Sequence, residues 1–210
     1  MLFKDWDIEL TGERVRITPM RMEDDPAYGK MLLGPVYEQS VAVLGKANTG
    51  IEKIIDHTEQ DETHALRLVG DDALVGWITL QKDMEGRPDI GISLVKEHQN
   101  HGIGPEAVTL FANRLHSVYG LDRVHVRISA LNPQCQKAFL KIGAVLDKAE
   151  PDYRLKKILD AFPEDARPDD PPPDMLFYHI DLPISGTPFT SKMATEPTGT
   201  SGQANQKSGR

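Results

Sequence analysis

Apolar and polar positions alternate along this chain with two periods, which predict an ordered series of strands and helices. In the first third, apolar runs on both sides of the Gly70-Asp71-Asp72 turn predict a β-hairpin. Further upstream, an apolar strand pattern is followed by two stretches with helical spacing, the second beginning at Thr49. The predicted elements of this part are a strand over 10–17, helices over 24–33 and 49–60, and strands over 65–69 and 74–80.

A strand and a helix flank the most informative loop of the sequence. Residues 89–95 are apolar and rich in β-formers, and a helix with Ala107, Phe111, Leu115 and Val118 on one face follows them. Pro105 suits the first turn of this helix, and Gly120 suits the position just after its end. The loop between the two elements carries two glycines and reads Gln99-Asn100-His101-Gly102-Ile103-Gly104.

This loop has the features of an anion-binding site. A glycine-bearing loop that leads into a helix N-terminus directs several unpaired backbone N–H groups at one point, and the helix dipole favours negative charge there. Two known phosphate loops fit poorly. The dinucleotide fingerprint needs a third glycine where this chain has Ala107, and a P-loop needs Lys and Ser or Thr after Gly104, where Pro105-Glu106 stands. A tight turn without a ligand is the alternative.

The C-terminal half continues the alternation of strands and helices. Val124, Val126 and Ile128 alternate with polar residues and predict a strand, and Pro133 begins a helix that reaches Ile142. Two more strands are predicted, over 143–146 and 176–182. Strands interrupted by helices on a mixed sheet indicate an α+β or α/β fold.

Composition places the chain among single-domain globular proteins. At 210 residues with 39% hydrophobic residues, it can bury one core. We expect no membrane span, because no apolar run approaches 18 residues. The N-terminus lacks a secretory pattern, and a single cysteine fits a reducing compartment, so we expect a cytoplasmic protein.

The charge balance bears on possible partners. The formal net charge of the whole chain is −8. Residues 185–210 have a net charge of +2, so residues 1–184 have a net charge of −10. An acidic body argues against nucleic acid as a partner and suits a cationic amine substrate. The other reading is that this acidity only serves solubility.

Two segments differ from the rest in composition. Residues 151–174 are acidic and proline-rich, and they are either a lid over an amine site or a solvated connection. Residues 185–210 are polar with almost nothing to bury, so we expect disorder there. The expected organisation is one domain over 1–184, with an insertion at 151–174, followed by the tail.

Two motifs in this order resemble those of the GNAT N-acetyltransferases. The spacing Gln99-x-x-Gly102-x-Gly104 is similar to the acyl-CoA pyrophosphate loop of that family, and 89–92 resembles the strand before it. The segment from Asn132 to Ala144 resembles the second motif of the branch that acetylates protein N-termini, including those of ribosomal proteins. The two motifs lie 28 positions apart, and the resemblance covers 10–182.

The resemblance implies a GNAT fold, which is α+β with a mixed, mostly antiparallel sheet flanked by helices. It also implies acetyl-CoA as co-substrate and direct attack of a primary amine on the thioester. The acceptor is then a protein N-terminus or a small molecule, without nucleic acid, membrane or metal, and the protein is a monomer or a homodimer. The residues that the family would use for the cofactor are Ile92, Ser93, Leu94, Gln99, Asn100, His101, Gly102, Ile103, Gly104 and Asn132.

Three residues are candidates for the chemistry. The backbone N–H of Leu94 corresponds to the donor for the developing oxyanion, and Asp89 to a proton acceptor acting through water. The alternative for Asp89 is a solvated residue at a strand start. Cys135 would be the third residue of a helix capped by Asn132, where the helix N-terminus is expected to lower the pKa of its thiol. It then donates a proton or a hydrogen bond to the leaving thiolate, or it is simply packed in the core.

One departure from the family keeps a second function open. Phe139 stands where many members have a tyrosine that protonates the thiolate, and the loop has no Arg or Lys. The alternative function is therefore a non-catalytic acyl-CoA-binding module that acts through protein contacts.

Overall fold

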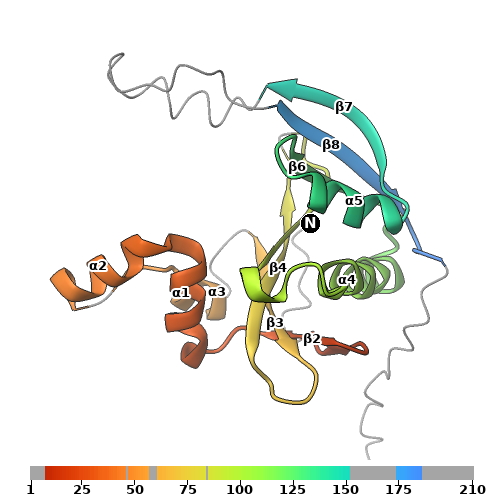
Figure 1. The fold of residues 1–210 in the computed structure, drawn as a ribbon. Coiled ribbons are helices and arrows are strands. Elements are labelled where there is room, and N and C mark those ends of the chain that lie inside the picture. The colour runs from red at the N-terminus through yellow and green to blue at the C-terminus, as the bar shows by residue number, and fades with distance from the viewer. Residues whose placement is uncertain (1–7, 46, 57–60, 84, 152–173, 186–210) are drawn as a thin grey trace, which may run out of the picture.

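The computed structural model describes residues 8–45, 47–56, 61–83, 85–151 and 174–185 (Figure 1). Their centre is an eight-stranded sheet with the order β1-β2-β3-β4-β5-β6-β8-β7. The strands are β1 (Leu10–Thr11), β2 (Val15–Pro19), β3 (Glu62–Leu68), β4 (Leu74–Lys82), β5 (Pro88–Leu94), β6 (Arg123–Ser129), β7 (Val145–Pro151) and β8 (Asp174–Asp181).

Helices cover both faces of this sheet. The α-helices are α1 (Asp25–Leu33), α2 (Pro35–Leu44), α3 (Ile51–Ile55), α4 (Ile103–Tyr119) and α5 (Pro133–Lys141), and the short 3-10 helices are η1 (Met22–Asp24) and η2 (Lys96–His98). Figure 1 shows α1, α2 and α3 grouped beside β3 and β4, well apart from α4 and α5.

Neighbouring residues of β4 show how the faces are divided. Ile78 is fully buried in the large core that includes α4, whereas Trp77 packs with the smaller cluster around α1 and α3. Tyr28 of α1 meets the Trp77 ring edge-on, at 5.2 Å between centroids. Because successive strand side chains point to opposite faces, α4 lies on one face of the sheet and α1 on the other.

The sheet has one parallel contact, and it lies next to the loop that the sequence singles out. All other neighbouring strands are antiparallel, but β5 and β6 run parallel and share a single registered pair, Asp89 with His125. Beyond that pair, no register links the two strands among the described residues, so they separate toward their C-terminal ends. This separation opens the sheet beside Ile92 and Leu94.

The predicted fold class is confirmed, with corrections to individual elements. The predicted strand over 10–17 is a hairpin of β1 and β2. Of the predicted helix over 49–60, the described residues form α3, and 57–60 lie outside them. The sequence did not predict α2. Its Val41, Val43 and Leu44 are exposed, so its apolar residues do not mark a core-facing stripe. Val118, expected on the apolar face of α4, is 44% exposed.

The two segments of unusual composition cannot be compared with the structure, since 152–173 and 186–210 lie outside the described residues. Among the helices of the described ranges, none is long and apolar enough to cross a membrane.

Candidate functional site

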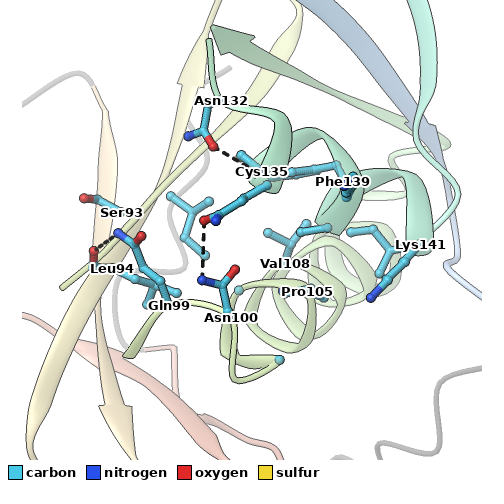
Figure 2. A pocket seen from close by; sticks show the side chains of 17 residues that line it. Ser93, Leu94, Gln99, Asn100, Pro105, Val108, Asn132, Cys135, Phe139 and Lys141 are labelled. Carbon is cyan, nitrogen blue, oxygen red and sulfur yellow. Dashed lines mark hydrogen bonds between the residues drawn. The ribbon is translucent and has the colours of Figure 1, made fainter. Parts of the chain in front are cut away.

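A pocket of about 490 Å³ lies beside the opening between β5 and β6. One wall is the end of β5, the floor is the glycine loop with the start of α4, and the opposite wall is α5 (Figure 2). Its lining residues are Ile92, Ser93, Leu94, Gln99, Asn100, Gly102, Gly104, Pro105, Val108, Asn132, Gln134, Cys135, Lys137, Ala138, Phe139, Lys141 and Ile142.

The glycine loop turns sharply into α4. Gly102 is the N-cap with φ +80°, a conformation that costs little only for glycine, and Asn100 also has a positive φ of 65°. The Gly102 carbonyl accepts the first helical hydrogen bond, from the Glu106 N–H at 3.2 Å. The free N–H groups of the first turn therefore point out of the end of the helix, from the pocket floor into the pocket. This is the geometry that binds phosphate.

An ion pair between the half-exposed Arg14 and the buried carboxylate of Glu106 fixes the start of α4. Glu106 is 1% exposed, and its carboxylate accepts hydrogen bonds from the Arg14 backbone N–H at 2.9 Å and the Arg14 Nη1 at 3.0 Å. Any side chain at Gly12 would overlap with this carboxylate. The β1–β2 hairpin thus anchors the loop, and Glu106 neutralises the charge of Arg14.

The backbone of Leu94 faces the opening rather than the neighbouring strand. The Val95 N–H donates to the Val75 carbonyl across β4 and β5, so the polar groups of the preceding residue, Leu94, point the other way. The Leu94 carbonyl indeed accepts a hydrogen bond from Gln99 Nε2 at 3.0 Å (Figure 2). The Leu94 N–H is consequently directed at the gap toward β6.

Asn132 and Cys135 form the start of the α5 wall. The Asn132 side chain caps the helix by accepting a hydrogen bond from the Cys135 N–H at 3.0 Å (Figure 2). Burial raises the pKa of the Cys135 thiol, whereas we expected the helix N-terminus to lower it. The cause is desolvation of the thiolate, so the thiol stays protonated at neutral pH.

Asp89 lies at the point where β5 and β6 part, outside the pocket lining. It is 1% exposed, and Arg127 of β6 donates to it from Nε at 3.0 Å and from Nη2 at 3.3 Å. Gln81 of β4 donates from Nε2 to Oδ1 at 2.8 Å. The carboxylate therefore joins three strands, and among the described residues one of its roughly four acceptor positions, on Oδ2, receives no donor.

The structure brings most of the predicted site residues together. Nine of them line one pocket, while Asp89, His101 and Ile103 do not. Ile103 is buried in the core with 3% exposure, and the His101 side chain is exposed. The nine are Ile92, Ser93, Leu94, Gln99, Asn100, Gly102, Gly104, Asn132 and Cys135.

Sequence reasoning did not predict the rest of the α5 wall. Gln134, Lys137 and Lys141 line the pocket, and Gln134 accepts a hydrogen bond from Asn100 Nδ2 at 3.4 Å. The signal that could have placed the two lysines on the pocket wall was their spacing from Gln134, because helical residues three or four apart share one face. Within the described ranges, no group of His, Cys, Asp and Glu could hold a metal ion.

Comparison with known proteins agrees with this architecture. The family profile described as acetyltransferase (GNAT) domain matches residues 14–145. Among solved structures, a GNAT-family acetyltransferase from Bacillus anthracis superposes with a TM-score of 0.59 at 17% identity, over 83% of this chain and 98% of that one. Mycobacterium smegmatis RimJ, solved with CoA-disulfide, superposes with a TM-score of 0.62 at 14% identity, over 84% of this chain and 88% of that one. No curated protein matches the sequence.

Proposed function

We propose that this chain, which belongs to the GNAT family of acetyltransferases, transfers the acetyl group of acetyl-CoA to a primary amine by direct attack. The observation that carries the proposal is the pocket itself. It brings together the N-terminus of α4, the end of β5 with the Leu94 backbone facing the opening, and a helix that bears a protonated thiol.

The cofactor would lie along the pocket in a defined direction. Its pyrophosphate would bind the N–H groups between Asn100 and Gly104, at the positive end of α4. Its pantetheine arm would then run between the end of β5 and Asn132, as the family arrangement implies. This direction brings the thioester to the opening between β5 and β6.

The backbone of β5 would assist the attack on the thioester. As the amine nitrogen forms its bond to the carbonyl carbon, negative charge develops on the carbonyl oxygen. The Leu94 N–H points into the gap where that oxygen would lie, and a fixed backbone donor there stabilises the charge without reorganising.

The two proton movements involve different residues. A free amine is mostly protonated at neutral pH and must lose a proton before it attacks. Asp89 lies five residues before Leu94 on β5 and outside the pocket lining, so this proton would travel through a chain of waters to the Asp89 carboxylate. At the other end, the protonated Cys135 thiol would donate a hydrogen bond to the departing sulfur. Because its pKa is raised, we propose stabilisation of the thiolate rather than full proton transfer.

Turnover with a panel of amines tests this function directly. The purified chain is incubated with acetyl-CoA and N-terminal peptides, polyamines, aminoglycosides or small amino compounds, and the release of free CoA thiol is followed. We expect acceptor-dependent thiol release with at least one class. Tight binding of acetyl-CoA without turnover on the whole panel would instead support the non-catalytic module. The buried Phe139 favours that alternative, because it stands where many family members have a tyrosine.

Cys135 should react slowly with a maleimide, and acetyl-CoA should slow the reaction further. A raised pKa leaves less thiolate at a given pH, so alkylation should be slower than for a free thiol and should speed up as pH rises. Bound cofactor would cover the pocket wall. Mass spectrometry of the alkylated chain at several pH values measures both effects.

A pair of substitutions then tests the donor role of Cys135. We expect Cys135→Ser to retain more turnover than Cys135→Ala, because serine keeps a hydrogen-bond donor. If alanine matches the wild type and acetyl-CoA gives no protection, Cys135 only packs in the core.

A further inference from the structure

Acetyl transfer releases a proton that the buried Asp89 would have to give up in every cycle. An ammonium group and a thioester become an amide, a free thiol and one proton, so a base that takes this proton must lose it before the next turnover. Asp89 is 1% exposed and lies outside the pocket lining. The cofactor and the acceptor would cover the pocket side during turnover, so the proton needs an exit on another side of the carboxylate.

A lateral row of titratable side chains leads from Asp89 toward the edge of the sheet. His125 of β6 is in register with Asp89, and His179 of β8 is in register with His125. Directly opposed residues of neighbouring strands point to the same face, with Cβ atoms about 5 Å apart. Val124 and Val126, which flank His125, belong to the core that includes α4. The three side chains of the row therefore stand next to one another on the opposite face.

A β-bulge in the outermost strand, β7, ends the row near the surface (Figure 1). The register between β7 and β8 shifts between Leu146 and Lys148, so Asp147 has no registered partner in β8, and such bulges redirect side chains. Its carboxylate instead accepts a hydrogen bond from His179 Nδ1 at 2.6 Å, which leaves Nε2 of the neutral ring as the acceptor. The side chains of His179 and Asp147 are 14% and 35% exposed, so a proton on this pair can pass to solvent.

His125 is set up to accept a proton and to release it again. Burial, and after it the charge of Arg87, lowers the pKa of its ring, so the ring is neutral at pH 7 and has one acceptor nitrogen. Asp83 and Asp147 act on this pKa in the opposite sense, so the imidazolium stays accessible as a short-lived state. The charged and titratable groups around His125 are Asp83, Arg87, Asp89, Arg123, Arg127, Asp147 and His179.

We propose that His125 carries the proton of the acceptor amine from Asp89 to the pair of His179 and Asp147, and so to solvent. This inference rests on the proposed function, with Asp89 as the proton acceptor. The Asp89 carboxyl gives its proton to the free ring nitrogen of His125, and the imidazolium releases the hydrogen of its other nitrogen to His179 Nε2. Among the described residues no direct hydrogen bond joins the three side chains, so a water bridges each step. His179 then loses its proton to solvent while Asp147 stabilises its charge.

Turnover of His125→Gln in dilute buffer, with and without added imidazole, tests this relay. Glutamine keeps a polar side chain at the position but cannot take up a proton. With a saturating acceptor at pH 7, we expect turnover to fall about tenfold, less than the factor of about 100 expected for the base itself. Imidazole in solution can carry the proton instead, so it should restore most of the turnover of the variant and leave the wild type unchanged. The KM for acetyl-CoA should stay the same, because His125 lies outside the pocket lining.

Two further variants complete the test. His116→Gln is the matched control, because His116 is a half-buried histidine of α4 outside the row, and its Nδ1 lies 2.8 Å from the Leu121 carbonyl oxygen. It should lose no turnover in dilute buffer. His179→Gln should repeat the loss and the rescue, and it serves as the test if His125→Gln does not fold. Full turnover of the folded row variants in dilute buffer, or a loss that imidazole does not restore, would overturn the relay. A wild type that acetylates no acceptor would instead contradict the proposed function, and the relay with it.

Discussion

Replacing Gly102 by aspartate is expected to abolish the stabilisation of the folded chain by acetyl-CoA. A ligand at about 100 times its Kd stabilises a protein by about 2.7 kcal/mol, which corresponds to about 5–10 °C in Tm for a chain of this size. The new carboxylate would stand at the start of α4, where the pyrophosphate is proposed to bind, and would repel it. Thermal unfolding with and without acetyl-CoA measures the effect, with NAD and ATP as ligands that should give no shift.

Two further variants separate charge from backbone strain. Gly102 has φ +80° and nothing nearer to an added Cβ than Arg14 Nε at 3.9 Å, so the cost of a side chain is conformational rather than steric. Gly102→Ala should therefore lower the Tm of the free chain but keep part of the cofactor shift. Gly45→Asp introduces the same charge at φ +73° at the end of α2, outside the pocket, and should keep the whole shift. A full shift in Gly102→Asp would show that the loop does not bind the cofactor.

The sequence predicted the floor and one wall of the pocket because those residues are close together in the chain. A strand, a loop of six residues and a helix start are placed by local rules, and the resemblance to the GNAT loop then assigned Leu94, Gln99 and Gly102 together. The α5 wall was only half predicted. Asn132 and Cys135 were assigned from the motif over 132–144, whereas the pocket-lining role of Lys137 and Lys141, in the same segment, stands out only once the opposite wall is known.

Two long-range pairs could not be predicted. Arg14 and Glu106 are 92 positions apart, and Asp89 and Arg127 are 38 positions apart. No local pattern links an arginine to one carboxylate among the 32 acidic residues of the chain. The direction of the pKa shift at Cys135 was likewise undecidable from spacing, since spacing does not show how much solvent a side chain keeps.

Substitution of Asp89 by asparagine is expected to lower both stability and turnover. Comparison with the variant Arg127→Met separates the loss of stability from the loss of the proton acceptor. Removing one member of a buried ion pair leaves the other charge without its partner and costs about 3–5 kcal/mol. Because Asp89 is 1% exposed and the Arg127 side chain 17%, we expect a fall in Tm of about 6–20 °C for Asp89→Asn and a similar one for Arg127→Met. Arg123 lies on β6, like Arg127, and forms an exposed ion pair with Asp181 of β8, so Arg123→Met should change Tm little.

Turnover at a temperature where all variants are folded decides the role of Asp89. A general base contributes about 100-fold or more to a rate, so Asp89→Asn should lose at least that factor. Arg127→Met keeps the carboxylate and frees acceptor positions on it for water, so its loss should stay within about tenfold. Equal losses in the two variants would show that Asp89 acts by joining β4, β5 and β6 at the point where the sheet opens. In that case water alone would take the proton of the amine, and the geometry of the opening would be the whole contribution of Asp89 to the reaction.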